Sequence, residues 1–164
     1  MDVRLLQAHD LVAALAINNA STPAVTEATE VRFAHIFQAA AVSLGTFDGE
    51  VLVGFSLALE PLADYDSSNY CWFGERYDNF VYLDRIAIAA SHQNRGLGSL
   101  LYEELERRIC TPVLACEVNL RPPNEGSLRF HERIGFREVG QQETPYGSLV
   151  SMLVKDIAAG VPKA

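Results

Sequence analysis

The chain has 164 residues, 49% hydrophobic and 21% charged, which predicts one folded domain over residues 1–164 and excludes a disordered chain. The net charge of −8 argues against a nucleic-acid partner, because binding the phosphate backbone needs a basic face. The apolar run at residues 11–17 is too short to span a membrane, and the N-terminus lacks a signal core. Three irregularly spaced cysteines, Cys71, Cys110 and Cys116, predict reduced thiols in a cytoplasmic protein rather than a disulfide framework.

Hydrophobic periodicity and turn residues predict a mixed α/β chain with about seven strands and four helices. In chain order the expected strands are residues 3–6, 41–47, 51–60, 80–88, 112–118, 137–141 and 148–155. The expected helices cover about residues 10–19, 27–40, 97–109 and 124–134. Asp48-Gly49 predicts a hairpin turn, and Asn124 and Gly135 predict the cap and the end of the last helix. Residues 60–80, rich in aromatic and charged side chains, predict a long functional loop.

A glycine-containing segment, Gln93-x-x-Gly96-x-Gly98, lies between a predicted strand and an amphipathic helix. The N-terminus of a helix offers N–H groups without intrahelical partners and a partial positive charge. Glycines allow an anion to approach these donors closely, so the segment predicts a phosphate or pyrophosphate site. The P-loop pattern is absent, and so is the dinucleotide pattern GxGxxG, because Leu101 occupies the third glycine position.

This spacing resembles the acyl-CoA loop of the GNAT superfamily of N-acetyltransferases, Q/R-x-x-G-x-G/A. Residues 124–136 are similar to a later helix of that family, N-x-x-A-x-x-F-Y-E-K-x-G-F. The shared positions are Asn124, Phe130, Glu132, Gly135 and Phe136, whereas Ser127, His131 and Arg133 replace Ala, Tyr and Lys. The order of elements also agrees, and the runs YLDRIAI and EVNLRPPN are similar to a bacterial subgroup of predicted acetyltransferases. The resemblance therefore implies a GNAT fold, a mixed sheet flanked by helices.

The resemblance also implies acetyl-CoA as the cofactor. Its pyrophosphate is expected on Gln93, Asn94, Arg95, Gly96, Leu97, Gly98 and Ser99. Its pantetheine arm is expected to pair with the backbone of Ile86, Ala87 and Ile88, and further contacts are expected from Asn124, Ser127, Phe130 and His131. No metal site is expected, because the other histidines lack ligand spacing.

Amine acetylation requires a neutral amine, a polarised carbonyl and a proton for the departing thiolate. His131 stands where the family often has an acidic Tyr, and its reference pKa suits the role of acid. Side-chain alternation along the strands makes Asp84 and Glu117 candidate bases, and the sequence does not choose between them. Either carboxylate could instead form an internal salt bridge with an arginine, such as Arg85 or Arg121.

The predicted activity is direct transfer of an acetyl group to a primary amine in a ternary complex. Side chains expected at the acceptor are Trp72, Phe73, Arg76, Tyr77 and Asn119, although Trp72 and Phe73 could equally pack under the loop. An acidic site would suit polyamines, aminoglycosides or lysine side chains, and an arginine-lined site would suit amino acids or peptide termini. The alternatives are a catalytically silent acyl-CoA-binding or sensing domain, and a domain that binds another phosphate ligand. The resemblance also implies that two copies can pair as a homodimer.

Overall fold

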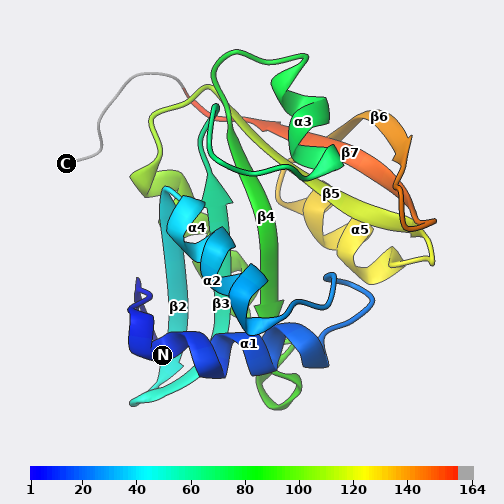
Figure 1. Cartoon of the computed structure of the whole chain (residues 1–164). Helices are drawn as coiled ribbons and strands as arrows, with labels where there is room; N and C mark the ends of the chain where they lie inside the picture. The colour runs from blue at the N-terminus through cyan, green and yellow to red at the C-terminus, as the bar shows by residue number, and fades with distance from the viewer. Residues whose placement is uncertain (159–164) are drawn as a thin grey trace. The chain divides into compact units, whose positions relative to one another are not determined.

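The structure, a computed structural model, describes residues 1–158, which form a seven-stranded mixed sheet with five α-helices (Figure 1). The strand order is β1-β2-β3-β4-β5-β7-β6. The strands are β1 (Asp2–Leu5), β2 (Val42–Asp48), β3 (Val51–Leu59), β4 (Val81–Ile88), β5 (Val113–Arg121), β6 (Arg137–Glu143) and β7 (Leu149–Asp156). The helices are α1 (Leu11–Ala20), α2 (Glu30–Ala39), α3 (Ser68–Gly74), α4 (Leu97–Arg108) and α5 (Glu125–Arg133). The predicted fold class and strand number are confirmed.

The chain divides into two compact units. The first contains Met1–Leu59 and Arg85–Ile109, and the second contains Glu60–Asp84 and the described residues from Cys110 onward. The single domain over residues 1–164 stays a prediction, and its last six residues lie outside the described part of the chain.

The first unit is built on an antiparallel hairpin. Strands β2 and β3 pair through the turn after Asp48, where Gly49 has a φ of +61°, so the turn predicted there is confirmed. In Figure 1, α1 and α2 lie in front of this hairpin and α4 lies behind it. Phe33 of α2 packs edge-on against Phe55 of β3, with ring centroids 5.5 Å apart, and both side chains are buried. Packing of these apolar faces fixes the helices on the sheet.

The second unit joins one parallel and two antiparallel strand pairs. Strand β7 lies antiparallel to both β5 and β6. Strand β4 runs parallel to β5, and its register pairs Val81 with Leu114 and Tyr82 with Ala115. In the part of the second unit that the structure describes, this ladder does not continue to Leu83 or beyond, although both strands do. The two strands therefore part directly after Tyr82.

One helix was missing from the prediction, because α3 lies inside residues 60–80, which were expected to form a loop. Ser67 begins this helix by accepting a hydrogen bond from the N–H of Tyr70 on its hydroxyl. The sequence around it, rich in Ser, Asp and Asn, is typical of turns. Burial of Tyr70 and Phe73 stabilises this seven-residue helix, and such tertiary packing is invisible to local propensity.

Candidate functional site

The segment between β4 and α4 presents backbone N–H groups at the start of a helix. Gln93 ties the segment to the end of β4, since its side-chain amide donates a hydrogen bond to the Ile88 carbonyl at 3.2 Å. Asn94 and Gly96 both have a positive φ, of 60° and 77°, and α4 begins at Leu97. Within the described residues no side chain caps this end, and the first turn carries no acidic residue. The donors of the first turn are therefore left for an external acceptor.

This segment fits a pyrophosphate. A Cβ added at Gly96 would meet no atom within 4 Å, so open space lies next to the turn. Gly98 and Ser99 are half-buried, and Arg95 is exposed beside them. Backbone donors, a helix N-terminus and a nearby cation are the groups that hold phosphate oxygens in proteins. The residues predicted from Gln93 to Ser99 thus form one continuous segment that ends in the first turn of α4.

Strand β4 presents two unlike faces. Asp84, Ile86 and Ile88 are half-buried, whereas the intervening Arg85 and Ala87 are buried. Arg85 belongs to the first unit and donates from Nη1 to Asn18 Oδ1 at 3.0 Å and to the Thr26 carbonyl at 3.2 Å. It thereby holds the segment between α1 and α2.

Two carboxylates stand where β4 and β5 part. Asp84 and Glu117 each lie two residues beyond the last pair of the ladder, Tyr82 and Ala115, so side-chain alternation places both on one face. The Tyr65 hydroxyl donates to Asp84 Oδ1, and the Tyr82 hydroxyl donates to Glu117 Oε2, each at 2.6 Å. Burial, followed by the charge of Glu117, raises the pKa of Tyr82 well above its ordinary value, so this phenol stays a donor.

A third tyrosine organises the segment that carries Tyr65. The Tyr70 hydroxyl donates to the Glu60 carbonyl and accepts from the N–H of Ala63 at 3.0 Å. Its ring lies 5.7 Å from that of Tyr65 and 5.5 Å from that of Tyr82. Sequence reasoning did not assign Tyr65 or Tyr70 to the site, and the only signal was the aromatic content of residues 60–80.

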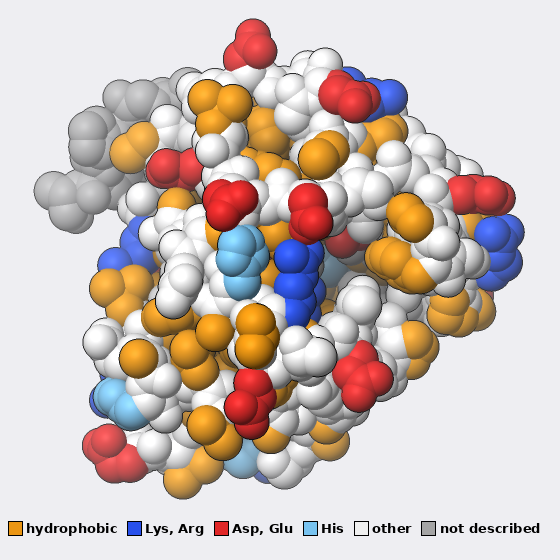
Figure 2. Space-filling model, in the orientation of Figure 1, with side chains coloured by type: hydrophobic (Ala, Val, Ile, Leu, Met, Phe, Trp, Pro, Cys, Tyr) orange, Lys and Arg blue, Asp and Glu red, His pale blue; other side chains and the backbone are white. Residues whose placement is uncertain are grey.

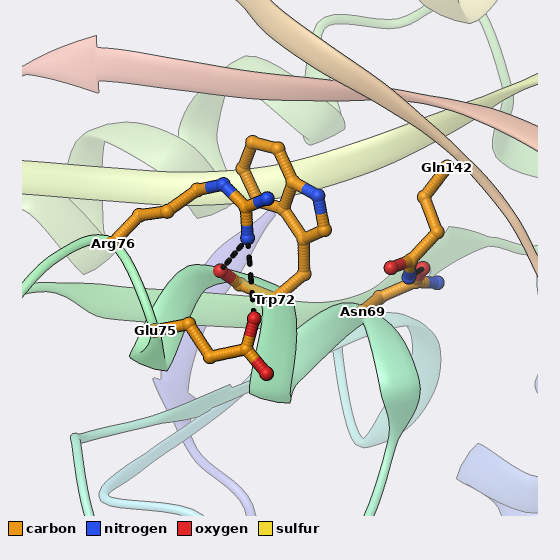
Figure 3. Close-up of polar contacts among 5 residues, drawn as sticks. All are labelled: Asn69, Trp72, Glu75, Arg76 and Gln142. Atoms are coloured by element: carbon orange, nitrogen blue, oxygen red, sulfur yellow. Dashed lines mark hydrogen bonds and ion pairs between the residues drawn. The ribbon is translucent and has the colours of Figure 1, made fainter.

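The acceptor residues predicted in α3 and just after it lie in different environments. Arg76 stacks on Trp72, with its Cζ 3.7 Å from the ring centroid, and donates to the Trp72 carbonyl at 2.9 Å (Figure 3). Phe73 is fully buried and contacts the ring of Tyr82, so it can act on an acceptor only through packing. The remaining predicted acceptor residues, Tyr77 on the segment after α3 and Asn119 on β5, are half-buried.

Helix α3 rests against β6. The Gln142 side-chain amide donates to Asn69 Oδ1 at 2.9 Å (Figure 3), and the Trp72 ring covers Gly140. A Cβ at Gly140 would lie 2.6 Å from Trp72 Cζ2, closer than two carbon atoms can approach.

Replacing Gly140 by Ala is therefore expected to displace the indole ring and to lower the free energy of unfolding by about 1–3 kcal/mol. Denaturant unfolding measures this change. The matched control is Gly126→Ala, because Gly126 lies in α5 with nothing within 4 Å of an added Cβ. Equal stability of the two variants would contradict close packing of Trp72 on Gly140.

His131 lies buried in α5. Its Nδ1 is 2.7 Å from the Ser127 carbonyl, an acceptor only, so Nδ1 carries the proton and Nε2 of the neutral ring is an acceptor. The rings of Phe130 and Phe136 meet it edge-on, each at 5.3 Å. Asn124, as predicted, caps α5 by accepting from the N–H of Ser127. Burial lowers the pKa of His131 from its ordinary value, and the hydrogen bond to Ser127 opposes this only in part.

The lowered pKa predicts a pH-dependent contribution to stability. Because the unfolded chain binds this proton more readily than the folded one, the contribution is complete above the unfolded pKa of about 6.5. It is lost as the pH falls through that value toward the lower folded pKa. Between about pH 7.5 and about pH 5, we expect the melting temperature of the wild type to fall more than that of the His131→Asn variant. His9→Asn, at an exposed position, is the control, and parallel pH profiles for the wild type and His131→Asn would refute the prediction.

The described residues contain no group of three or more His, Cys, Asp or Glu side chains that could hold a metal ion. None of their helices has the length and apolar character required to cross a bilayer. On the face shown in Figure 2, acidic and basic side chains are scattered among neutral and hydrophobic ones, and no continuous basic patch forms among the described residues there.

The model of the acetyltransferase (GNAT) family matches residues 14–136. No curated protein matches the chain significantly.

Among solved structures, Ard1 from Thermoplasma volcanium aligns with a TM-score of 0.78 at 13% identity, over 96% of this chain and 97% of that one. The ribosomal-protein-S18-alanine N-acetyltransferase from Escherichia coli aligns at 0.74 and 18%, covering 99% and 97%. YncA from Salmonella typhimurium, solved with its cofactor acetyl-CoA, aligns at 0.72 and 19%, covering 98% and 96%. At these identities the structures show a shared fold.

Proposed function

We propose, since the chain belongs to the GNAT acetyltransferase family, that it moves an acetyl group from acetyl-CoA directly to a primary amine in a ternary complex. As a member of this family it is an acetyltransferase that uses acetyl-CoA. The observation that carries the finer proposal is the pair of carboxylates, Asp84 and Glu117, on one face where β4 and β5 part.

The proposed cofactor-binding residues lie first of all on the segment before α4. The N–H groups around Gly96 and the first turn of α4 would hold the pyrophosphate, with Arg95 adding positive charge. The half-buried Ile86 and Ile88 leave their face of β4 for the pantetheine arm. Asn124, Ser127 and Phe130 are proposed as further contacts. Acetyl-CoA supplies the acetyl group as a thioester, whose carbonyl carbon is the electrophile.

Glu117 is the proposed base. An amine arrives largely as ammonium at neutral pH and becomes a nucleophile only after losing a proton. Glu117 has one oxygen, Oε2, fixed by a buried phenol, so the carboxylate is oriented before the amine arrives. Asp84 is the proposed second carboxylate, which adds negative charge to the same face beside Glu117. A carboxylate base of this kind contributes about 100- to 10,000-fold in rate.

His131 remains the predicted proton donor for the thiolate. Donation from Nε2 requires the imidazolium, the form that burial disfavours. A thiol with a pKa of about 8.5 also leaves as the thiolate with little assistance. We therefore propose that His131 acts mainly as a contact to the cofactor, and that proton donation is its secondary role.

The test is a calorimetric titration with acetyl-CoA, ATP and NAD, followed by a thiol-release assay with a panel of alkyl amines. Micromolar binding of acetyl-CoA alone, with turnover of an amine, is expected. Binding without turnover on any amine would favour a silent acyl-CoA sensor. Binding of ATP or NAD in preference to acetyl-CoA would overturn the proposal in favour of another phosphate ligand. A cytoplasmic location, a bacterial origin and a homodimer remain predictions from the sequence.

A further inference from the structure

Two carboxylates of the second unit, Asp84 and Glu117, are held by tyrosines in different surroundings. Tyr82 is fully buried, and its ring lies 5.5 Å from Tyr70 and 5.8 Å from Phe73, so its hydroxyl cannot leave Glu117 without disturbing the core. Tyr65 is half-buried and belongs to a segment without helix or strand. Tyr65 therefore holds Asp84 from a loop, whereas Tyr82 holds Glu117 from the core.

The segment that carries Tyr65 is anchored by hydrogen bonds near its start. Tyr70 bonds to Glu60 and Ala63, and the N–H of Tyr65 donates to the Ala63 carbonyl at 2.8 Å. These contacts place the Tyr65 ring beside Tyr70 and leave its hydroxyl on Asp84 Oδ1. A carboxylate can accept more than one hydrogen bond, so Asp84 can bind an ammonium while the phenol holds it in place, and the bond from the charged donor is the stronger.

We propose that Tyr82 and Tyr65 are positioning residues with separate tasks in the acetyl transfer proposed above, on which this inference rests. Tyr82 orients Glu117 as the base for the reacting amine. Tyr65 orients Asp84 to bind a second ammonium group of the acceptor. The structure thus points to an alkyl diamine or polyamine as the acceptor class.

The charge arrangement supports this class. Two carboxylates on one face favour a dication and repel an acceptor carboxylate. Adjacent parallel strands lie about 4.8 Å apart. Where the strands part, two side chains at equivalent positions are therefore separated by roughly the length of a short alkyl chain. Two arginines were candidates for binding a carboxylate of the acceptor. Arg85 is instead buried and hydrogen-bonded to Asn18 and Thr26. Arg76 is stacked on Trp72.

The experiment compares three acceptors of matched length: a linear diamine, the monoamine lacking its second amino group, and lysine, which adds a carboxylate. Steady-state kinetics with the wild type, Tyr65→Phe and Tyr82→Phe separate KM from kcat. The wild type should prefer the diamine to the other two by about 10-fold or more in kcat/KM. Tyr65→Phe should raise KM for the diamine severalfold and leave the monoamine unchanged. Tyr82→Phe should lower kcat for both about 10- to 100-fold, with acetyl-CoA binding retained.

A double-mutant cycle separates positioning from folding. If Tyr82 acts through Glu117, its replacement has no further effect on kcat in a Glu117→Gln background, whereas a general loss of structure would still lower activity and melting temperature. Tyr146→Phe, at an exposed tyrosine, is the control for the substitution itself. Equal use of monoamine and diamine, or unchanged kinetics of Tyr65→Phe, would overturn this inference alone. Failure of the wild type to acetylate any amine would overturn the proposed function and this inference with it.

Discussion

Replacing Glu117 by Gln is expected to lower kcat/KM for the acceptor amine about 100- to 10,000-fold while acetyl-CoA still binds. The amide has the same shape as the carboxylate and can still accept the hydrogen bond from Tyr82, which lies 2.6 Å from Oε2. It cannot take a proton from the ammonium, so the amine stays protonated and does not attack. The measurement is thiol release under steady state, together with a calorimetric titration of acetyl-CoA.

The comparison for this variant is Glu103→Gln, which removes the same charge from an exposed position of α4. Because both variants change the net charge equally, a general electrostatic effect would appear in both. Near-wild-type activity of Glu117→Gln would remove Glu117 from the mechanism. Asp84→Asn would then be the next variant to measure, since Asp84 stands at the equivalent position on β4.

Replacing Gly96 by Glu is expected to weaken acetyl-CoA binding at least about 100-fold. Gly96 precedes α4 with a φ of 77°, next to open space. A carboxylate there would compete with the pyrophosphate for the N–H groups of the first turn and would repel its charge. Part of the lost affinity should return at high salt, because screening weakens the repulsion. Isothermal titration calorimetry at two salt concentrations measures both effects.

The matched variant is Gly49→Glu. Gly49 also has a positive φ, of 61°, and a Cβ added there also meets nothing within 4 Å. Each substitution places the same side chain in a left-handed conformation, at a cost of about 1–2 kcal/mol. The two variants should therefore lose similar stability, and only Gly96→Glu should lose the cofactor. Equal affinity for acetyl-CoA in both would place the pyrophosphate elsewhere.

Much of the fold was determined by local sequence. The turn at Asp48-Gly49, the glycine entry to α4 and the cap at Asn124 each depend on the backbone preferences of one or two residues. Such preferences act wherever the residues occur, so they can be predicted without knowing what packs against them. The spacing from Gln93 to Gly98 carried the family resemblance for the same reason, because a pyrophosphate loop is a contiguous segment.

The tertiary structure alone decided how the candidate site is assembled. Tyr65 reaches Asp84 across 19 residues of sequence and Tyr82 reaches Glu117 across 35, and no periodicity encodes such pairs. Helix α3 forms because Tyr70 and Phe73 are buried against Phe80 and Tyr82, which lie outside the helix. Local propensity determines most of the helices and strands, whereas α3 and the pairing of distant polar groups depend on tertiary packing and on how the strands register and part. The sequence therefore predicted the cofactor loop and two candidate bases, and the fold supplied the tyrosines that orient them.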